Sequence, residues 1–490
     1  MPIPGCIVVQ LKKMEGDAMS TALVLFRRDL RLADNPAWSA ACAEHAQVLP
    51  VFILPDEDGR WSAGAASRWW LHHSLAALAQ SLRDAGAGLH LCRGEPLEVL
   101  RTLIRRSGAT TVYWNRRYEP DTLARDAQIK NALQSEGVAV HTHNAALWRE
   151  PWHIATQQGQ PYKVFTPYWR NLRPQLQAVE PLPAPSVPGW HAWSDSLPLT
   201  DLKLLPRIDW AGGLRENWRP GEAGAQELLE IFGDDAIGDY ANSRDLPARH
   251  GTSRLSPHLH FGEISPRQIH FELERRARTI DAKRRPDLEP YLRELGWREF
   301  AHHLLFHFPH TPSENFNPRF AKFPWAPPDQ LSLEFWQQGR TGIPLVDAGM
   351  RELWHTGWMH NRVRMIVGSL LTKNLRLHWQ HGARWFWDTL VDADLANNTL
   401  GWQWVAGCGA DAAPYFRVFN PVTQAKKFDP DGVYLRRWLP ELADAPLHVL
   451  HEPWKDNALR QRSGYPEPII DLARSRQQAL DAYAATRDPR

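Results

Sequence analysis

The stretch TALVLFRRDLRLADNPAWSAACAEHAQVLPVFIL, residues 21–54, sets an apolar run, a helical pattern and a second apolar run in succession. Short apolar runs separated by helical patterns predict parallel strands joined by crossover helices. The alternation continues to about His143 through LHLCR, TTVYWN and VAVHTH. We therefore predict an α/β domain over residues 21–150, built on a doubly wound, Rossmann-like parallel sheet.

The rest of the chain has a different character. Between about Trp152 and Leu214 the periodicity dissolves and four prolines fall between residues 181 and 188, which predicts an extended connector over residues 151–219. Helical patterns then follow one another, among them SPRQIHFELERRAR and YLRELGWREFAHHLLF. They predict an all-α domain over residues 220–490. Residues 1–20 lack the features of a secretion signal and are interpreted as an N-terminal extension.

Composition limits the class of protein. A length of 490 residues exceeds one ordinary core, and no apolar run is long enough to cross a bilayer, so we expect two domains and no membrane span. The four cysteines lie far apart, which favours a reducing, cytoplasmic location over a disulfide framework. His303 and His307 share a helix face, but no HExxH frame accompanies them, and no metal is expected.

Tryptophan is unusually abundant. Seven of the 24 tryptophans fall within residues 354–404, and residues 340–384 hold seven basic residues against two acidic ones. Tryptophan beside arginine is typical of surfaces that stack bases and follow phosphates. It is equally typical of a packed helical core, and for any single tryptophan the core is the better interpretation.

The segment GTSRLSP, residues 251–257, places three hydroxyls and an arginine just before a helical pattern. It can cap that helix or hold a phosphate, and the residues alone favour the cap. The carboxylate pairs Asp392/Asp394 and Glu294/Glu299 can serve acid–base chemistry, solvent, caps or arginines.

Several long motifs occur in a recognisable order. FRRDLRLADNPAW, GTSRLSP, ELGWREF, TGIPLVDAGMRELWHTGWMHNRVRM, DADLANNTLGWQW and YFRVFNPVTQAKKFD resemble the photolyase/cryptochrome family from about Thr21 to Pro440, most of all its class I cyclobutane pyrimidine dimer photolyases. The resemblance implies an α/β antenna domain and a helical domain holding a bent FAD. It also implies a carbon–carbon lyase that takes a flipped lesion from DNA and splits it with an electron from photoexcited, reduced FAD.

The resemblance assigns a set of cofactor residues. They are Tyr240, Thr252, Ser253, Arg254, Leu255, Ser256, Tyr291, Arg364, Asp392, Ala393, Asp394 and Asn398. Asn398 matches the residue that faces flavin N5, where a neutral amide avoids the repulsion that a carboxylate would exert on an anionic reduced flavin. This favours repair over plant-type signalling, in which an aspartate usually takes that position.

Lesion and DNA contacts are implied in the same way. Asn361 and Met365 stand where (6-4) repair enzymes carry a histidine pair, which favours cyclobutane dimers, and the soft Met365 would pack on the lesion. Further positions match residues that bind the dimer (Glu294, Trp297, Trp404) or DNA (Arg244, Arg298, Asn361, Arg362, Thr423).

Three tryptophans match a chain that carries electrons from the surface to oxidised flavin: Trp402, Trp379 and Trp325. With Asn398, Glu294 and Met365 they complete the predicted catalytic set. Trp354, Trp385 and Trp387 are left to packing.

An antenna pigment is the least specific expectation. The α/β domain carries neither a GxGxxG nor a GxxxxGK[ST] loop. Positions that bind folate in relatives carry Ala63 or Gly64, Thr122 and Pro312-Ser313, so folate is not expected. A deazaflavin, a second flavin or no pigment remain open.

Two other classes of protein compete with a monomeric repair enzyme. A cryptochrome shares the fold but usually carries a long disordered tail, whereas IIDLARSRQQALDAYAA runs almost to the end of this chain with a helical pattern. A light-independent nucleic-acid-binding module would bind undamaged DNA in a salt-dependent way and carry no flavin.

Overall fold

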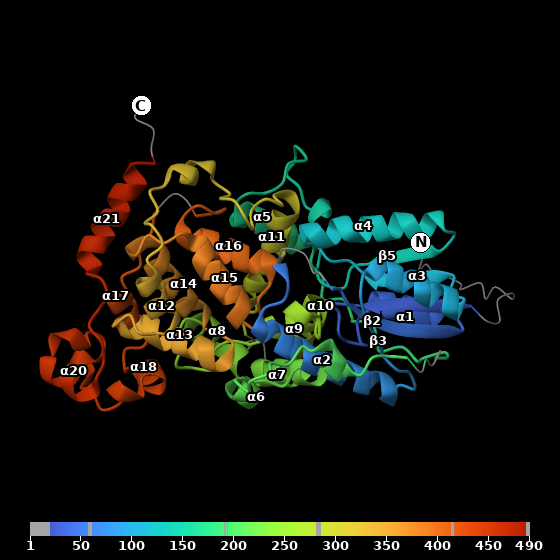
Figure 1. Ribbon diagram of the computed structural model, residues 1–490, viewed down its shortest axis with the longest axis horizontal. Helices are drawn as coiled ribbons and strands as arrows, with labels where there is room; N and C mark the ends of the chain where they lie inside the picture. Colours follow the sequence, from blue (N-terminus) through green and yellow to red (C-terminus); the bar gives the residue numbers. More distant parts are fainter. Residues whose placement is uncertain are drawn as a thin grey trace, which may run out of the picture.

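The N-terminal part of the chain is a five-stranded parallel sheet, seen at the right of the computed structural model, which describes residues 20–56, 61–190, 193, 195–280, 286–412 and 416–486 (Figure 1). The strands lie in the order β3-β2-β1-β4-β5 and all pairs are parallel. Their bounds are β1 Thr21–Phe26, β2 Gln47–Leu54, β3 His90–Arg93, β4 Thr111–Asn115 and β5 Ala139–His143. The order reverses between β1 and β4, and ligands of open α/β sheets bind beyond the carboxyl ends at such a point.

Helices cover both faces of the sheet, as a doubly wound fold requires. Val24 and Phe26 of β1 pack towards α1 (Pro36–Glu44) and α2 (Ala65–Asp84). The alternate residues Leu23 and Leu25 pack towards α3 (Pro96–Ser107) and α4 (Pro120–Ser135). The predicted α/β class is confirmed, because side chains of one strand alternate between two buried faces.

The C-terminal part is helical, as predicted. Its helices are α6 Gly212–Asn217, α7 Glu222–Asp234, α8 Tyr240–Ser243, α9 Ser256–Phe261, α10 Pro266–Thr279, α11 Glu289–His307, α12 Gln330–Gln337, α13 Pro344–Thr356, α14 Asn361–Ser369, α15 Trp379–Thr389, α16 Leu395–Ala406, α17 Pro421–Phe428, α18 Val433–Trp438, α19 Leu447–Leu450, α20 Asn457–Ser463 and α21 Leu472–Ala484. A π-helical turn, Leu370–Asn374, follows α14. Within the described ranges, none of the helices combines the length and apolar character needed to cross a bilayer.

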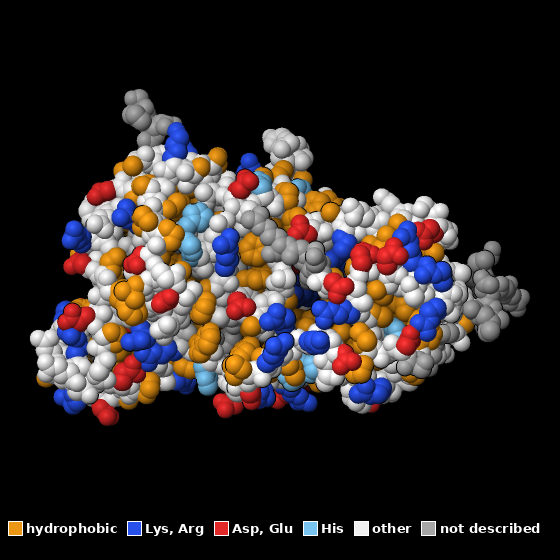
Figure 2. Space-filling model, in the orientation of Figure 1, with side chains coloured by type: hydrophobic (Ala, Val, Ile, Leu, Met, Phe, Trp, Pro, Cys, Tyr) orange, Lys and Arg blue, Asp and Glu red, His pale blue; other side chains and the backbone are white. Residues whose placement is uncertain are grey.

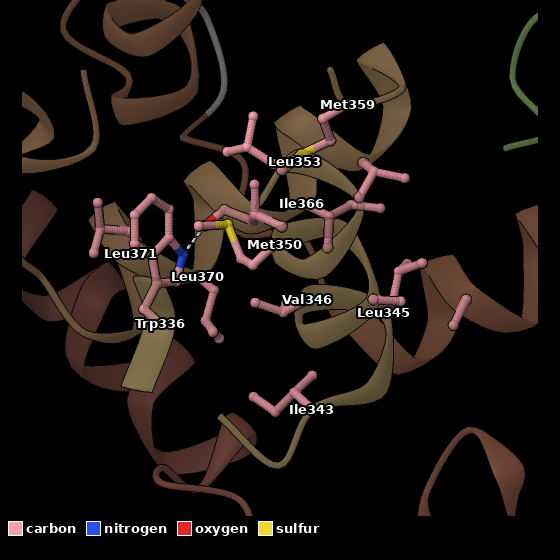
Figure 3. Close-up of a cluster of buried hydrophobic side chains, with 14 of the residues drawn as sticks. Trp336, Ile343, Leu345, Val346, Met350, Leu353, Met359, Ile366, Leu370 and Leu371 are labelled. Atoms are coloured by element: carbon pink, nitrogen blue, oxygen red, sulfur yellow. Dashed lines mark hydrogen bonds between the residues drawn. The ribbon is translucent and has the colours of Figure 1, made fainter. Parts of the chain in front are cut away.

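The core of this part forms around α12 to α16. Figure 3 shows Trp336 of α12 beside Met350 of α13 and Leu370 and Leu371 of the π-helical turn, with its indole Nε1 donating to the carbonyl of Val367 over 3.0 Å. Because the ring is buried and its N–H has a hydrogen-bond partner, this contact fixes the position of the Trp336 side chain in the core.

The predicted connector is more ordered than its prolines suggested. Residues 165–172 form α5 (Phe165–Leu172), which buries Phe165, Tyr168, Trp169 and Leu172 in a cluster shared with α11. These four residues recur at helical spacing, so the signal for α5 was present. The extension predicted over residues 1–20 lies, apart from Ser20, outside the described residues.

The tryptophan-rich run divides between core and surface. Trp379 and Trp402 are buried, and Trp385 and Trp387 pack partly buried against the same core. Trp354 contradicts the packing interpretation, because it lies on the solvent side of α13 with 65% of its surface exposed. It stacks on Trp385 with ring centroids 5.9 Å apart.

The motif that follows β1 joins the two parts of the molecule. Arg31 is 1% exposed and donates to the carbonyls of Gly262, Ala145, Asp34 and Ala33. The Asp34 carboxylate in turn accepts from Ser265 Oγ over 2.6 Å and from Arg267 Nε over 3.1 Å. A buried guanidinium with this many partners favours one arrangement of the two parts.

Candidate active site

The predicted cofactor residues of α8, α11 and the 252–256 turn meet through a chain of contacts. The rings of Tyr240 and Tyr291 lie 5.2 Å apart, edge to face. Tyr291 OH donates to Ser253 Oγ over 3.0 Å, and the Arg244 guanidinium lies 5.5 Å from the Tyr240 ring. Tyr240 and Tyr291, about fifty positions apart in sequence, therefore lie together at the predicted cofactor site.

The cap interpretation of GTSRLSP is wrong. The N-cap of α9 is Leu255, and no side chain caps the helix. Ser256 Oγ instead donates to Asp392 Oδ2 over 2.6 Å, and the Trp358 indole donates to Ser256 Oγ over 3.3 Å. The Ser256 hydroxyl therefore bonds to a residue distant in sequence and does not cap the helix, so the segment can serve another role, such as binding an anion.

Arg254 is the cation of this segment. Its guanidinium lies between the indoles of Trp218 and Trp358, 4.4 and 5.1 Å from their centroids. Burial lowers the pKa of Arg254, although Glu352 opposes this effect. Its Nε is buried and has no hydrogen-bond partner among the described residues. A half-buried guanidinium whose buried Nε has an unused donor fits an anionic group such as a diphosphate.

A second part of the site lies where the loop before α16 meets α14. Arg364 Nη2 donates to both carboxylate oxygens of Asp392, over 2.8 and 3.1 Å. Ala393, beside it, is buried. Asn398 Nδ2 donates to the carbonyl of Ala383 over 3.0 Å. Since the amide N–H is engaged, the side-chain oxygen of Asn398 is left to accept a hydrogen bond.

The outer part of the site carries paired charges. Arg244 donates to Glu294 over 2.7 Å, and Arg362 donates to Asp245 over 2.7 Å. Arg362 also lies 3.8 Å from the sulfur of Met365. Each of these two arginines is therefore neutralised by a neighbouring acid. Acidic and basic side chains are also interspersed over the face of the molecule drawn in Figure 2.

The remaining predicted contacts fall in different places. Asn361 is exposed at the start of α14, and Thr423 is exposed on α17. Trp404 is half-buried near the end of α16, and Trp297 stacks on Phe165 with centroids 3.8 Å apart.

Arg298 does not lie with the predicted DNA contacts. Its position on α11 faces the α/β part, where it donates to the carbonyl of Ala146 over 2.8 Å. Its side chain is 14% exposed. The prediction that Arg298 binds DNA is therefore not supported by its placement.

The three predicted electron-carrying tryptophans lie on α16, on α15 and in the segment before α12. Trp402 packs on Phe386 with centroids 4.9 Å apart and lies directly against Gly382, where an added Cβ would come within 2.0 Å of its ring. Trp379 lies one turn before Gly382 on α15, and its Nε1 donates to Asn315 over 2.8 Å. Trp325 is half-buried near the surface.

The sequence interpretation missed a cleft between the two parts. It has about 460 Å³ of empty space, part of it open to solvent, at the carboxyl ends of β1 and β4. Its charged lining residues include Arg28, Arg117, Glu119, Arg298 and Asp394, with His260 and His302 beside the Asp394 carboxylate. The available signal was a pair of adjacent arginines directly after each of the two strands.

Asp394 lines this cleft, whereas Asp392 does not. The Asp394 Oδ1 accepts from the backbone N–H of Asn397 over 2.9 Å, so it caps α16. Its Oδ2 lies 3.6 Å from His302 and 3.7 Å from His260. Asp394 therefore links the cleft to the helix that carries Asn398.

The paired histidines of α11 pack against other groups. The rings of His303 and His307 lie 4.5 Å apart, and His303 Nε2 accepts from the backbone N–H of Tyr162 over 3.0 Å. In the described part of the chain no three His, Cys, Asp or Glu side chains are grouped to hold a metal ion.

Two family models match the chain. Residues 22–186 match the DNA photolyase model, and residues 291–485 match the FAD binding domain of DNA photolyase. The deoxyribodipyrimidine photo-lyase of Agrobacterium fabrum is 45% identical over 474 residues, which cover 95% of this chain and 98% of the relative. The chain belongs to the DNA photolyase family. Cryptochrome-2 of Arabidopsis thaliana is 39% identical over 95% of this chain and 79% of its own length.

Solved photolyases have the same fold. A bacterial class III photolyase from Agrobacterium tumefaciens is 43% identical with a TM-score of 0.90, covering 97% of this chain and 99% of its own. An archaeal photolyase from Sulfolobus tokodaii, solved with two FAD molecules, is 29% identical with a TM-score of 0.80, covering 95% of this chain and all of its own. The predictions of a photolyase-type enzyme and of a FAD-binding helical domain are confirmed. The similar solved photolyase from Agrobacterium tumefaciens belongs to class III, whereas the motifs resembled class I.

Proposed function

We propose that this photolyase repairs cyclobutane pyrimidine dimers in DNA with light. The observation that carries the proposal is Asn398 on α16, whose amide nitrogen donates to the carbonyl of Ala383 and so leaves the amide oxygen to accept a hydrogen bond. Reduced FAD would supply a photoexcited electron to the dimer. A neutral amide at Asn398 stabilises a reduced, anionic cofactor better than a carboxylate would.

The residues present fit the cofactor. Arg254 offers a half-buried, partly unpartnered guanidinium to a diphosphate, and the hydroxyls of Thr252 and Ser253 lie beside it in the sequence. Arg364 and Asp392 fix each other and present donors and acceptors to a polar ring edge. Tyr240 and Tyr291 are buried and pack edge to face, which would help to exclude water from a bound cofactor.

Glu294 and Met365 would receive the lesion. Glu294 accepts from Arg244 through Oε1, which leaves its second carboxylate oxygen to accept from a base N–H. Met365 and Trp404 offer polarizable and aromatic surface to a base taken out of the stack. Arg244, Arg362, Asn361 and Thr423 would follow the DNA backbone, with each arginine exchanging an acid for a phosphate.

Trp402, Trp379 and Trp325 would return the cofactor to its reduced state. Trp402 and Trp379 are buried in the core, while Trp325 is partly exposed and can meet a reductant in solution. Their order from core to surface suits stepwise electron movement inward.

The cleft between the two parts is the candidate site for a second, light-harvesting chromophore. It lies at the topological switch point of the sheet, and several arginines line it, which suits an anionic pigment. The Sulfolobus relative with two FAD molecules supports a flavin as one candidate. Extraction and chromatography of the bound pigments will identify it.

A signalling cryptochrome is the second candidate function, favoured by the 39% identity to an Arabidopsis cryptochrome. One experiment separates the two. Reduced protein is incubated with an oligonucleotide containing a thymine dimer, in blue light and in darkness. Repair in light alone supports the proposal, whereas a flavin-loaded protein that repairs nothing in light points to signalling.

A further inference from the structure

The imidazole of His378 lies between two tryptophans from different parts of the chain. Its centroid is 4.9 Å from the ring of Trp325, at an interplanar angle of 64°, and 5.5 Å from that of Trp379, at 31°. Trp325 precedes α12, and Trp379 is the first residue of α15. Among the described aromatic pairs no direct ring contact joins the two indoles, and the His378 ring contacts both.

The helix cap holds this imidazole in its neutral form. His378 is the N-cap of α15, and its Nδ1 accepts from the backbone N–H of Gln380 over 3.3 Å. An accepting Nδ1 carries no proton, so the proton of the neutral ring is on Nε2. Protonating Nδ1 would break the cap as well as charge the ring.

The surroundings favour the same form. Burial lowers the pKa of His378 to about 4, and His381 and Arg384 on α15 act in the same direction. The side chain that packs on His378 from another segment, Trp325, is uncharged. At neutral pH the ring is therefore an uncharged bridge.

We propose that His378 couples Trp325 to Trp379 during light-driven reduction of the bound flavin, and that it does so only as the neutral imidazole. The inference rests on the electron path proposed above. One electron moves from Trp325 to oxidised Trp379, Trp325 loses its indole proton to solvent, and a thiol reductant in solution then restores Trp325. His378 is neither oxidised nor protonated, and acts as a positioning residue. A cation in its place would oppose the positive charge that each indole carries in turn.

The test removes the ring and keeps the cap. His378→Asn supplies a side-chain oxygen of the kind preferred at N-caps, so α15 is retained. At pH 7 light reduction of the flavin is expected to slow several-fold, and transient absorption should show the Trp379 radical lost by recombination before Trp325 is oxidised. Chemically pre-reduced His378→Asn protein should repair like the wild type. His381→Asn, on the same helix and without a ring contact to either indole among the described pairs, is the matched control and should reduce its flavin normally.

Acidity supplies a second readout. Below about pH 5 light reduction by the wild type should decline as His378 gains a proton, while the slower rate of His378→Asn should stay level over the range in which circular dichroism shows a folded chain. If reduction is abolished in both Trp379→Phe and Trp325→Phe, the electron path is supported. If His378→Asn then keeps wild-type reduction rates and radical lifetimes, the inference about His378 is overturned while the path stands. Normal reduction in Trp379→Phe would overturn the path and the inference with it.

Discussion

Arg244, directly after α8, and Glu294 of α11 form an ion pair, with Nη1 and Oε1 2.7 Å apart. Glu294→Gln should lower repair about tenfold, because a charge-assisted hydrogen bond to the lesion is weakened. The unpaired Arg244 should raise the affinity for undamaged DNA at low salt, because it no longer has to leave Glu294 to reach a phosphate. Repair assays and salt titrations of binding measure both effects. Glu136→Gln breaks an exposed pair in the α/β part and should change neither.

Trp402→Phe should block reduction of the oxidised flavin by light. The innermost tryptophan of the path would be replaced by a ring that is much harder to oxidise. Pre-reduced protein should still repair dimers, so the two assays are run on the same preparation. Trp438→Phe, outside the path, is the control. A pre-reduced Trp402→Phe protein that cannot repair would contradict the role assigned to Trp402.

Asn398→Asp should retain flavin and lose most light-driven repair. A carboxylate near a reduced, anionic flavin costs several kcal/mol at intermediate dielectric, which shifts the cofactor towards oxidised or protonated forms. Absorption spectra under a reductant report the form, and dimer repair reports the activity. Repair at the wild-type rate with an unchanged reduced spectrum would rule out this role for Asn398.

Arg31→Ala should destabilise the protein by about 3–5 kcal/mol, because it leaves buried carbonyls and the Asp34 carboxylate short of donors. Denaturant unfolding followed by fluorescence measures the loss. Arg105→Ala, on the exposed side of α3, should cost less than about 0.5 kcal/mol. Equal losses in the two variants would mean that the junction contributes little.

Glu352→Gln should change how stability depends on pH. Burial raises the pKa of Glu352 to about 7 from a usual value near 4.5, although Tyr434 OH hydrogen-bonds to it. The native state thus binds this proton more tightly than the unfolded chain. The stabilisation from the protonated carboxyl is full below pH 4.5 and is lost as the pH rises to about 7, in total about 3 kcal/mol. Relative to wild type, Glu352→Gln should therefore become more stable as the pH rises from 5 to 8, measured by unfolding at each pH.

Much of the fold was predictable because it depends on local periods. The strand and helix patterns of residues 21–143 placed the sheet, and the helical patterns from residue 220 onward placed the second part. Errors arose where partners distant in sequence decide the outcome. Ser256 looks like a cap until Asp392, over a hundred positions away, takes its hydroxyl. Trp354 looks like a core residue because composition cannot tell which side of α13 faces solvent.

The candidate site was predictable only as far as motif resemblance reached. Its residues come from α8, α11, α14 and α16, and no local rule joins them. The interdomain cleft and His378 escaped notice for the same reason, since both depend on distant segments meeting. Arg298 shows the same limit, because the motif names the residue and only the fold shows that its side chain donates to Ala146 in the α/β part.

The hydrogen bonds that the Asp34 carboxylate accepts from Ser265 and Arg267 have a consequence for inheritance. A photolyase half grafted onto a relative's partner half would need the aspartate and its two donors to come from compatible parents. The two halves are therefore expected to evolve as a single unit. For any pigment held at the sheet edge, the separation and mutual orientation of two chromophores would then be inherited with these junction contacts and not with the pigment pocket itself.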